Sequence, residues 1–186
     1  PSFATLSGGL DSRMTVLMAH QLGYKQQLIN FSQKGYADEV IAHQIANHYQ
    51  LKISHLELTE ESLTAIDDII RVNDGLTLYS GAGHALQALR QLSKQVRGIL
   101  HTGMLGDAIL GSYLSAPTDS PVKASSGAYT TKDLEHSELF AEIASKYPNE
   151  ELFKFYNRAF QGINNGYLYL NLFSESLSPF MHPNFI

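Results

Sequence analysis

The sequence predicts a parallel α/β domain with a helical C-terminal part. Over roughly the first hundred residues, short apolar runs alternate with helical patterns, which is typical of strand–helix–strand units and a parallel sheet. The turn Ser7–Ser12, with two glycines, separates the first apolar run from the first helical pattern. From Lys132 onward only helical patterns remain.

The first four expected elements are two strands, each followed by an amphipathic helix. In chain order they are Ser2–Leu6, Asp11–Leu22, Gln27–Ser32 and Ala37–Tyr49. Gly23 is a stop signal for the first helix. The second helix places Ile41, Ile45 and Tyr49 at i, i+4 and i+8, so these residues mark its buried side.

The middle of the chain predicts two more strands with helices between them. In chain order these elements are the strand Lys52–Leu58, a helix from Thr59, a helix at Ala82–Gln95 and the strand Gly98–Thr102. Thr59 suits a helix N-cap, and Glu60 and Glu61 suit the positive end of the helix. A glycine-rich turn follows the last of these strands.

The last third combines a long loop with three helices. Residues 115–129 are rich in Ser, Pro, Thr, Ala and Gly, and a mobile loop is expected there. The helices are expected at Lys132–Lys146, Asn149–Phe160 and Asn164–Ser176. Residues 1–186 then form one domain. Because the chain opens with Pro1 directly before a strand, it is expected to be a piece of a longer protein.

The composition is that of an ordinary soluble domain, with 44% hydrophobic and 17% charged residues and a net charge of −5. No block of Lys and Arg suggests a nucleic-acid partner. The chain has no cysteine, which excludes thiolate chemistry and cysteine–zinc sites. No apolar run approaches the roughly 20 residues of a membrane span. A cytoplasmic location without a membrane partner is therefore expected.

The turn Ser7–Ser12 has the features of an anion-binding site. Its glycines let the backbone approach a ligand closely, and the following helix offers unpaired N–H groups to a pyrophosphate. The sequence Ser-Gly-Gly-Leu-Asp-Ser resembles the S-G-G-x-D-S loop of ATP pyrophosphatases, which split ATP into AMP and pyrophosphate. The resemblance implies that ATP is bound by Leu6, Ser7, Gly8, Gly9, Asp11 and Ser12.

Further segments resemble the asparagine synthetase-like family. They are Phe31-Ser32, Asp38-Glu39, His55-Leu56-Glu57, Thr102–Tyr113, similar to [ST]-G-x-G-x-D-E-L-F-G-G-Y, and Glu175–Phe180, similar to E-x-R-x-P-F-L-D. The resemblance implies a fold of the adenine nucleotide alpha-hydrolase type. It also adds Phe31, Ser32, Thr102 and Gly103 to the nucleotide-binding residues, with the adenine near Phe31 and Ser32.

Asp11 and Asp107 follow two different strands of the expected sheet. Ligands bind at the carboxyl edge of such sheets, so both carboxylates are expected to face one site. Two carboxylates repel a polyphosphate unless a divalent cation lies between, and Mg²⁺ prefers such oxygen ligands. The resemblance also implies that Asp11 and Asp107 are catalytic residues, which bind Mg²⁺ beside the pyrophosphate of ATP.

The function implied by the resemblance is an ATP-dependent amide-forming ligase. It would adenylate a carboxylate and transfer ammonia or an amine, releasing AMP and pyrophosphate. Any glutaminase domain that supplies ammonia would precede Pro1, and the 186-residue chain alone is expected to show little ligase turnover. The small residues at Ser80–His84 favour an acceptor larger than aspartate.

Two other functions remain open. Met104 and Ala108 replace glutamates of the asparagine synthetases, which leaves a degenerate, non-catalytic nucleotide-binding module as one alternative. The second alternative is that the protein belongs to another class of ATP pyrophosphatase.

The histidines do not predict a metal site. His43 and His48 are five residues apart and share no helix face. His55 and His101 are expected to be hydrogen-bonded in strands, and Asp38-Glu39 is expected to be a solvated first helical turn.

Overall fold

The computed structural model describes residues 2–60, 66–75, 86, 89–91, 98–114, 120–123 and 138–185. Most of the expected loop 115–129, most of Ala82–Gln95 and the whole of Ser80–His84 lie outside the described residues. Among the helices that are described, none has the length and apolar character needed to cross a membrane.

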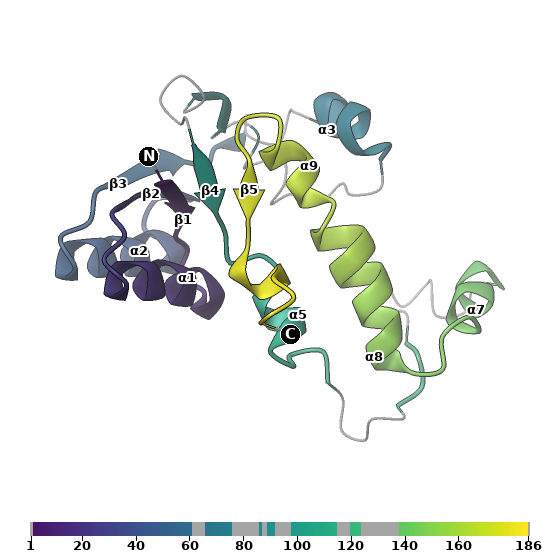
Figure 1. Ribbon diagram of the computed structural model, residues 1–186. Coiled ribbons are helices and arrows are strands. Elements are labelled where there is room, and N and C mark those ends of the chain that lie inside the picture. The colour runs from purple at the N-terminus through teal and green to yellow at the C-terminus, as the bar shows by residue number, and fades with distance from the viewer. Residues whose placement is uncertain are drawn as a thin grey trace.

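The fold is built on one parallel sheet of five strands (Figure 1). The strands are β1 (Ser2–Thr5), β2 (Gln26–Ser32), β3 (Ile53–Glu57), β4 (Ile99–His101) and β5 (Ser176–Leu177). Their order is β3-β2-β1-β4-β5, and every neighbouring pair is parallel. The predicted parallel α/β fold is therefore confirmed.

The strand order reverses direction next to β1. From β1 the chain moves outward to β2 and β3, and it then returns to place β4 on the other side of β1. The crevice outside the carboxyl ends of the strands at such a switch point is where open α/β sheets bind ligands. This topology directs attention to the turns that follow β1 and β4.

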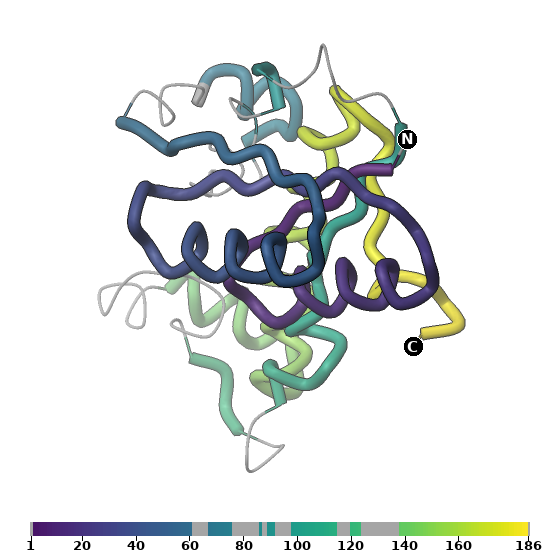
Figure 2. The backbone as a smooth tube through the Cα atoms, turned by 90° about the vertical axis from the view of Figure 1, so that its left-hand side faces the viewer, coloured from purple at the N-terminus to yellow at the C-terminus, as the bar shows by residue number. Residues whose placement is uncertain are grey.

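Helices α1 (Leu10–Gln21) and α2 (Ala37–His48) pack side by side on one face of the sheet (Figure 2). The buried side chains of this layer come from β1, β2 and both helices: Ala4, Leu6, Val16, Leu28, Ala42 and Ala46. Small alanines on α2 let the helix approach the strands closely.

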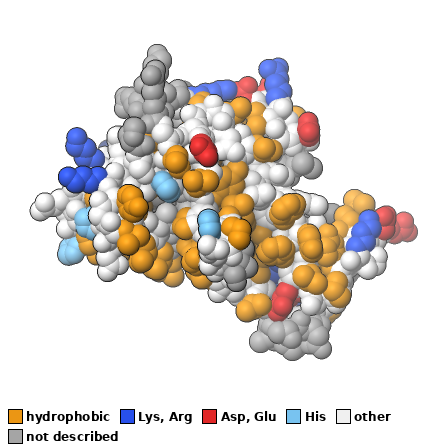
Figure 3. Space-filling view, viewed as in Figure 1, with side chains coloured by type: hydrophobic (Ala, Val, Ile, Leu, Met, Phe, Trp, Pro, Cys, Tyr) orange, Lys and Arg blue, Asp and Glu red, His pale blue; other side chains and the backbone are white. Residues whose placement is uncertain are grey.

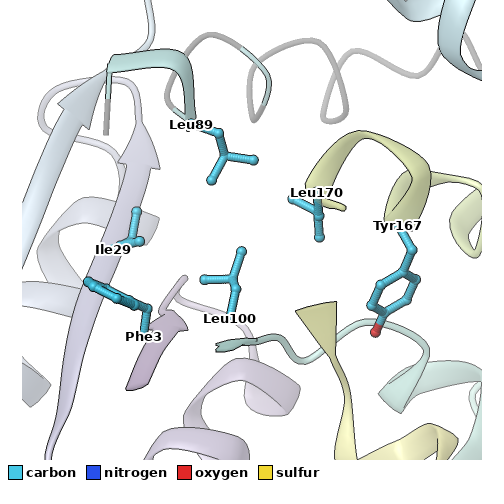
Figure 4. Packing of buried hydrophobic residues seen from close by; sticks show 6 residues of the cluster. All are labelled: Phe3, Ile29, Leu89, Leu100, Tyr167 and Leu170. Atoms are coloured by element: carbon cyan, nitrogen blue, oxygen red, sulfur yellow. The ribbon is translucent and has the colours of Figure 1, made fainter. Parts of the chain in front are cut away.

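The opposite face is covered by helix α9 (Gly166–Leu170) and by the segment around Leu89. Figure 4 shows the six buried residues of this layer converging between the sheet and α9: Phe3, Ile29, Leu89, Leu100, Tyr167 and Leu170. Helix α3 (Ile66–Asn73) packs on α9 through Ile69 and Tyr169. Neighbouring strand residues such as Phe3 and Ala4 serve opposite layers, as the pleat requires.

The C-terminal part is helical up to Leu170. It contains α7 (Glu138–Ala144), α8 (Glu150–Phe153), the π-helix η3 (Lys154–Ile163) and α9. The side chain of Asn149 caps α8 by accepting a hydrogen bond from the Leu152 N–H (2.9 Å). Exposed large apolar side chains lie along this segment, and Figure 3 shows hydrophobic groups gathered over it. Such a patch is typical of a contact surface.

The prediction of a helix over Asn164–Ser176 is wrong at its C-terminal end. After Leu170 the chain turns, and Ser176–Leu177 forms β5, paired with Leu100 and His101 of β4. A two-residue strand has no periodicity that a sequence could display. The short 3₁₀ helix η4 (Pro179–Met181) follows, with proline at its first position, where proline is tolerated.

Burial of His101 in β4 predicts a loss of stability in acid. Desolvation lowers the pKa of His101 below its ordinary 6.5. The unfolded chain therefore binds a proton more readily than the folded one, and stability falls as the pH drops below about 6.5. We expect His101→Gln to reduce the fall in Tm between pH 7.5 and pH 5.5. The matched change His48→Gln, at an exposed position, should leave that fall unchanged. Equal falls in Tm for wild type and His101→Gln would contradict this prediction.

Candidate functional site

The turn after β1 and the turn after β4 are in direct contact. The Asp107 N–H donates a hydrogen bond to Asp11 Oδ2 (3.0 Å). Asp11 lies in the first turn of α1, and Asp107 lies in the first turn of the short helix α5 (Gly106–Ile109). The expectation that the two turns share one edge of the sheet is thus confirmed.

Gly103 makes this contact sterically feasible. A Cβ atom added to Gly103 would lie 2.5 Å from the backbone nitrogen of Ser12 and 2.7 Å from the carbonyl carbon of Asp11. Both neighbours are main-chain atoms of α1 and cannot rotate away. The Gly103 turn therefore packs directly on the start of α1.

The first turn is held by its two serines. Ser12 Oγ accepts the Ser7 N–H (3.0 Å) and lies 3.0 Å from Ser7 Oγ, which in turn accepts the Gly9 N–H (3.1 Å). Gly9 is the N-cap of α1, and no side chain caps this helix among the described residues. Its open N–H groups, together with the helix dipole, favour an anionic ligand.

Asp38 ties this turn to helix α2. The Gly8 N–H donates to Asp38 Oδ1 (2.7 Å), and a Cβ on Gly8 would lie 2.7 Å from that same oxygen. Asp38 is exposed in the first turn of α2, as expected, but its carboxylate also fixes the loop, a role that the expectation did not include. In the sequence, the Asp38-Glu39 motif is the feature that could have indicated this role of Asp38.

A cavity of about 350 Å³ opens between the two turns. It is lined by Thr5, Leu6, Ser7, Gly9, Asp11, Ser12, Ile29, Asn30, Phe31, Gly103, Met104, Leu105, Asp107 and Ile163. Its volume is in the range of small-molecule pockets. Eight of the sequence-predicted site residues are in this lining: Leu6, Ser7, Gly9, Asp11, Ser12, Phe31, Gly103 and Asp107.

The other predicted residues are not part of the lining. Ser32 is buried and donates from Oγ to Asn30 Oδ1 (2.7 Å). Thr102 is also buried, with Oγ1 3.0 Å from the Tyr167 hydroxyl. Gly8 is turned toward Asp38. In this structure these three residues support the turns and the strand ends.

The two aspartates make the site electrostatically unfavourable without a cation. Burial raises the pKa of Asp11, the Asp107 N–H lowers it in part, and the Asp107 carboxylate raises it again by repulsion. A divalent ion with oxygen ligands would relieve both desolvation and repulsion, so the residues present fit Mg²⁺.

The second turn departs from a glycine-rich pattern at Leu105. Leu105 has a φ of +66°, and it stands where the motif [ST]-G-x-G-x-D-E has its second glycine. A left-handed conformation costs a non-glycine residue about 1–2 kcal/mol. The Leu105 side chain is buried with Tyr113 and Ala159, and such burial contributes about 1.5–3 kcal/mol. Packing thus offsets the strain.

Met104 is held in place by the C-terminal segment. Ser178 Oγ donates to the Met104 carbonyl (2.8 Å), and the Met104 side chain packs on the core beneath α9. The chain therefore needs the segment after β5 to complete the second turn. In the sequence, only the Glu175–Phe180 motif signals this contact.

Comparison with known protein families identifies one family for this chain. A family model of asparagine synthase matches residues 1–166. No curated protein matches the chain. Among solved structures, a predicted subunit of tRNA methyltransferase from Methanocaldococcus jannaschii is similar at a TM-score of 0.44 and 15% identity, over 100% of this chain and 73% of that one. Since the family model spans most of the chain, including both turns, this ATP pyrophosphatase-type domain belongs to the asparagine synthase family.

Proposed function

We propose that the protein is an ATP-dependent, AMP-forming amide ligase. The observation that carries the proposal is the contact between Asp11 and Asp107 at the mouth of one cavity, beside the open N-terminus of α1. The site offers N–H donors for phosphate oxygens and two carboxylates for a cation. Family membership supports ATP as the nucleotide.

The cavity suggests how ATP lies. In the proposed binding mode the phosphates lie at the Ser7–Ser12 turn, where the start of α1 offers backbone N–H groups. The nucleoside then extends along the end of β2 toward Phe31, the aromatic residue of the lining. Asp11 and Asp107 would hold Mg²⁺, which when bound neutralises charge on the departing pyrophosphate.

The chemistry proceeds in two displacements. An oxygen of the acceptor carboxylate bonds to the α-phosphorus of ATP as the bond to the β-phosphate breaks, giving an acyl-adenylate and pyrophosphate. The nitrogen of ammonia or an amine then attacks the acyl carbon, AMP leaves and the nitrogen loses a proton. The protein contributes by positioning the reactants and by stabilising the charge that develops on them, without a covalent enzyme intermediate.

A nucleotide-binding module without ligase activity is the second candidate. Met104 and Ala108 favour it, because neither side chain can move a proton during attack by the amine. In the ligase, the proton of the incoming amine must then pass to another group or to water.

Pyrophosphate release separates the two candidates. The full-length protein is incubated with Mg²⁺, ATP, ammonia or glutamine, and a panel of carboxylates that includes aspartate and larger acids. The ligase predicts pyrophosphate and AMP in equal amounts, dependent on one of the acids, with an amide product. Asp107→Asn should reduce this rate by at least about a hundredfold, in line with loss of charge stabilisation. ATP binding without acid-dependent pyrophosphate release would favour the non-catalytic module. Pyrophosphate release without an amide would favour another ATP pyrophosphatase class.

A further inference from the structure

Three potential metal ligands meet between α2 and β3, at the edge of the sheet. Glu39 and His43 are one turn apart on α2, and His55 lies on the edge strand β3. The ligand atoms of these three side chains all lie within 4.8 Å of one another. The rings of His43 and His55 have their centroids 5.8 Å apart.

Asn30 fixes the orientation and the tautomer of His55. The Asn30 amide nitrogen donates to the Leu6 carbonyl (2.8 Å) and the Asp38 carbonyl (3.3 Å), so its Oδ1 is the acceptor. His55 Nδ1 lies 2.8 Å from that oxygen and must therefore be the donor. In a neutral ring this leaves a lone pair on Nε2. Metal-bound histidines share this arrangement: one ring nitrogen donates its hydrogen to an oxygen acceptor, and the other ring nitrogen binds the metal.

The free nitrogen of His55 faces another acceptor. His55 Nε2 is buried and has no hydrogen-bond partner among the described residues. Its nearest charged neighbour is Glu39 Oε1 at 3.7 Å, beyond hydrogen-bond range. The other oxygen of Glu39, Oε2, accepts the Gly35 N–H, which holds the carboxylate in place. With Nδ1 as the donor, both His55 Nε2 and Glu39 Oε1 are electron-pair donors 3.7 Å apart, and a shared cation would satisfy both.

We propose that Glu39, His43 and His55 bind a transition-metal dication of the Zn²⁺ class. Two imidazoles and one carboxylate suit Zn²⁺ and similar ions, whereas Mg²⁺ prefers oxygen ligands alone. Zinc bonds of about 2.0–2.2 Å place tetrahedral ligands roughly 3.4 Å apart. The 3.7 Å between His55 Nε2 and Glu39 Oε1 is already close to this spacing, so rotation of the His43 side chain is the main adjustment needed. The site is distinct from the Asp11–Asp107 pair. It joins α2 to β3, and because the cluster supplies three protein ligands, the fourth tetrahedral position would be left to water.

Zinc titration of the metal-free full-length protein tests the proposal. Isothermal calorimetry should show one Zn²⁺ per chain with a dissociation constant of about 10 μM or tighter, and Zn²⁺ should raise the Tm. Co²⁺ in its place should give the visible absorption of a tetrahedral site. His43→Ala and Glu39→Gln should each weaken Zn²⁺ binding at least tenfold. The melting curve of each variant without metal shows whether that variant is folded. If one of the two variants fails to fold, the other still tests the proposal.

His48→Ala is the matched control, because His48 lies on the same helix but outside the cluster. It should leave Zn²⁺ binding unchanged. Equal losses for His48→Ala and His43→Ala, or no binding at 100 μM Zn²⁺, would overturn the proposal. Asp11→Asn should retain Zn²⁺ binding, so failure of this site and failure of the ATP site are distinguishable.

Discussion

Asp11→Asn is expected to weaken the binding of Mg²⁺–ATP at least tenfold and to leave the binding of AMP almost unchanged. In the proposed binding mode the lost charge would face the cation and the pyrophosphate, whereas AMP carries neither. One unit of charge in a metal site is worth more than the 1.4 kcal/mol that a tenfold change represents. Calorimetric titration with each nucleotide, with and without Mg²⁺, measures the difference.

The same substitution should not lower the stability of the nucleotide-free protein. The pKa of Asp11 is raised in the folded state above its ordinary 3.8, so ionisation of this group opposes folding at neutral pH. Asparagine removes that charge and can still accept the Asp107 N–H. We expect an equal or higher Tm at pH 7, and a smaller difference near pH 4, where the aspartate is partly protonated.

Asp74→Asn provides the matched control, since it makes the same change of charge at an exposed turn. It should alter neither nucleotide binding nor Tm. If Asp11→Asn weakens AMP and Mg²⁺–ATP equally, Asp11 is a structural residue of the turn and the metal assignment is wrong.

The parts of the fold with strong periodic signals were predictable. The strand–turn–helix from Ser2 to α1 follows from an apolar run and two glycines before a helical segment, and the structure places the second turn beside it as the sheet rule requires. The expected amphipathic character of α1 is wrong, because Met14 and Met18 are exposed. β5 could not be predicted in this way. It is held to β4 by pairing across more than seventy residues of chain, and its two residues have no pattern of their own.

The contacts that support the site could not be predicted from the sequence, for a related reason. Asp38 and Leu105 each have a local interpretation, as a helix-start acid and as an ordinary apolar residue. Their actual roles depend on Gly8 and Tyr113, which the fold alone brings near. The cluster of Glu39, His43 and His55 shows the same effect. The next histidine along the sequence after His43 is His48, but its neighbour in space is His55, which pairs in register with Asn30 of β2.

Gly103→Ala is expected to have the largest effect on stability. The added Cβ would meet the main chain of α1 at 2.5 Å, so the helix start or the second turn must move. Overpacking of this kind costs about 3 kcal/mol, near the upper end of the usual range. For a chain of this size that corresponds to a fall in Tm of roughly 6–12 °C. Because the displaced atoms belong to the Ser7–Ser12 turn, the affinity for ATP should fall at least tenfold as well.

Gly35→Ala separates steric overlap from backbone strain. Gly35 has a φ of +79° with nothing within 4 Å of an added Cβ, so alanine there suffers strain alone, about 1–2 kcal/mol. Thermal melts and nucleotide titrations of both variants give the comparison. A fall in Tm for Gly103→Ala no larger than that for Gly35→Ala would mean that the two turns can separate without cost, and that their contact does not organise the site. A larger fall, accompanied by the loss of ATP binding in Gly103→Ala alone, ties the close approach of the two turns to the function of the cavity between them.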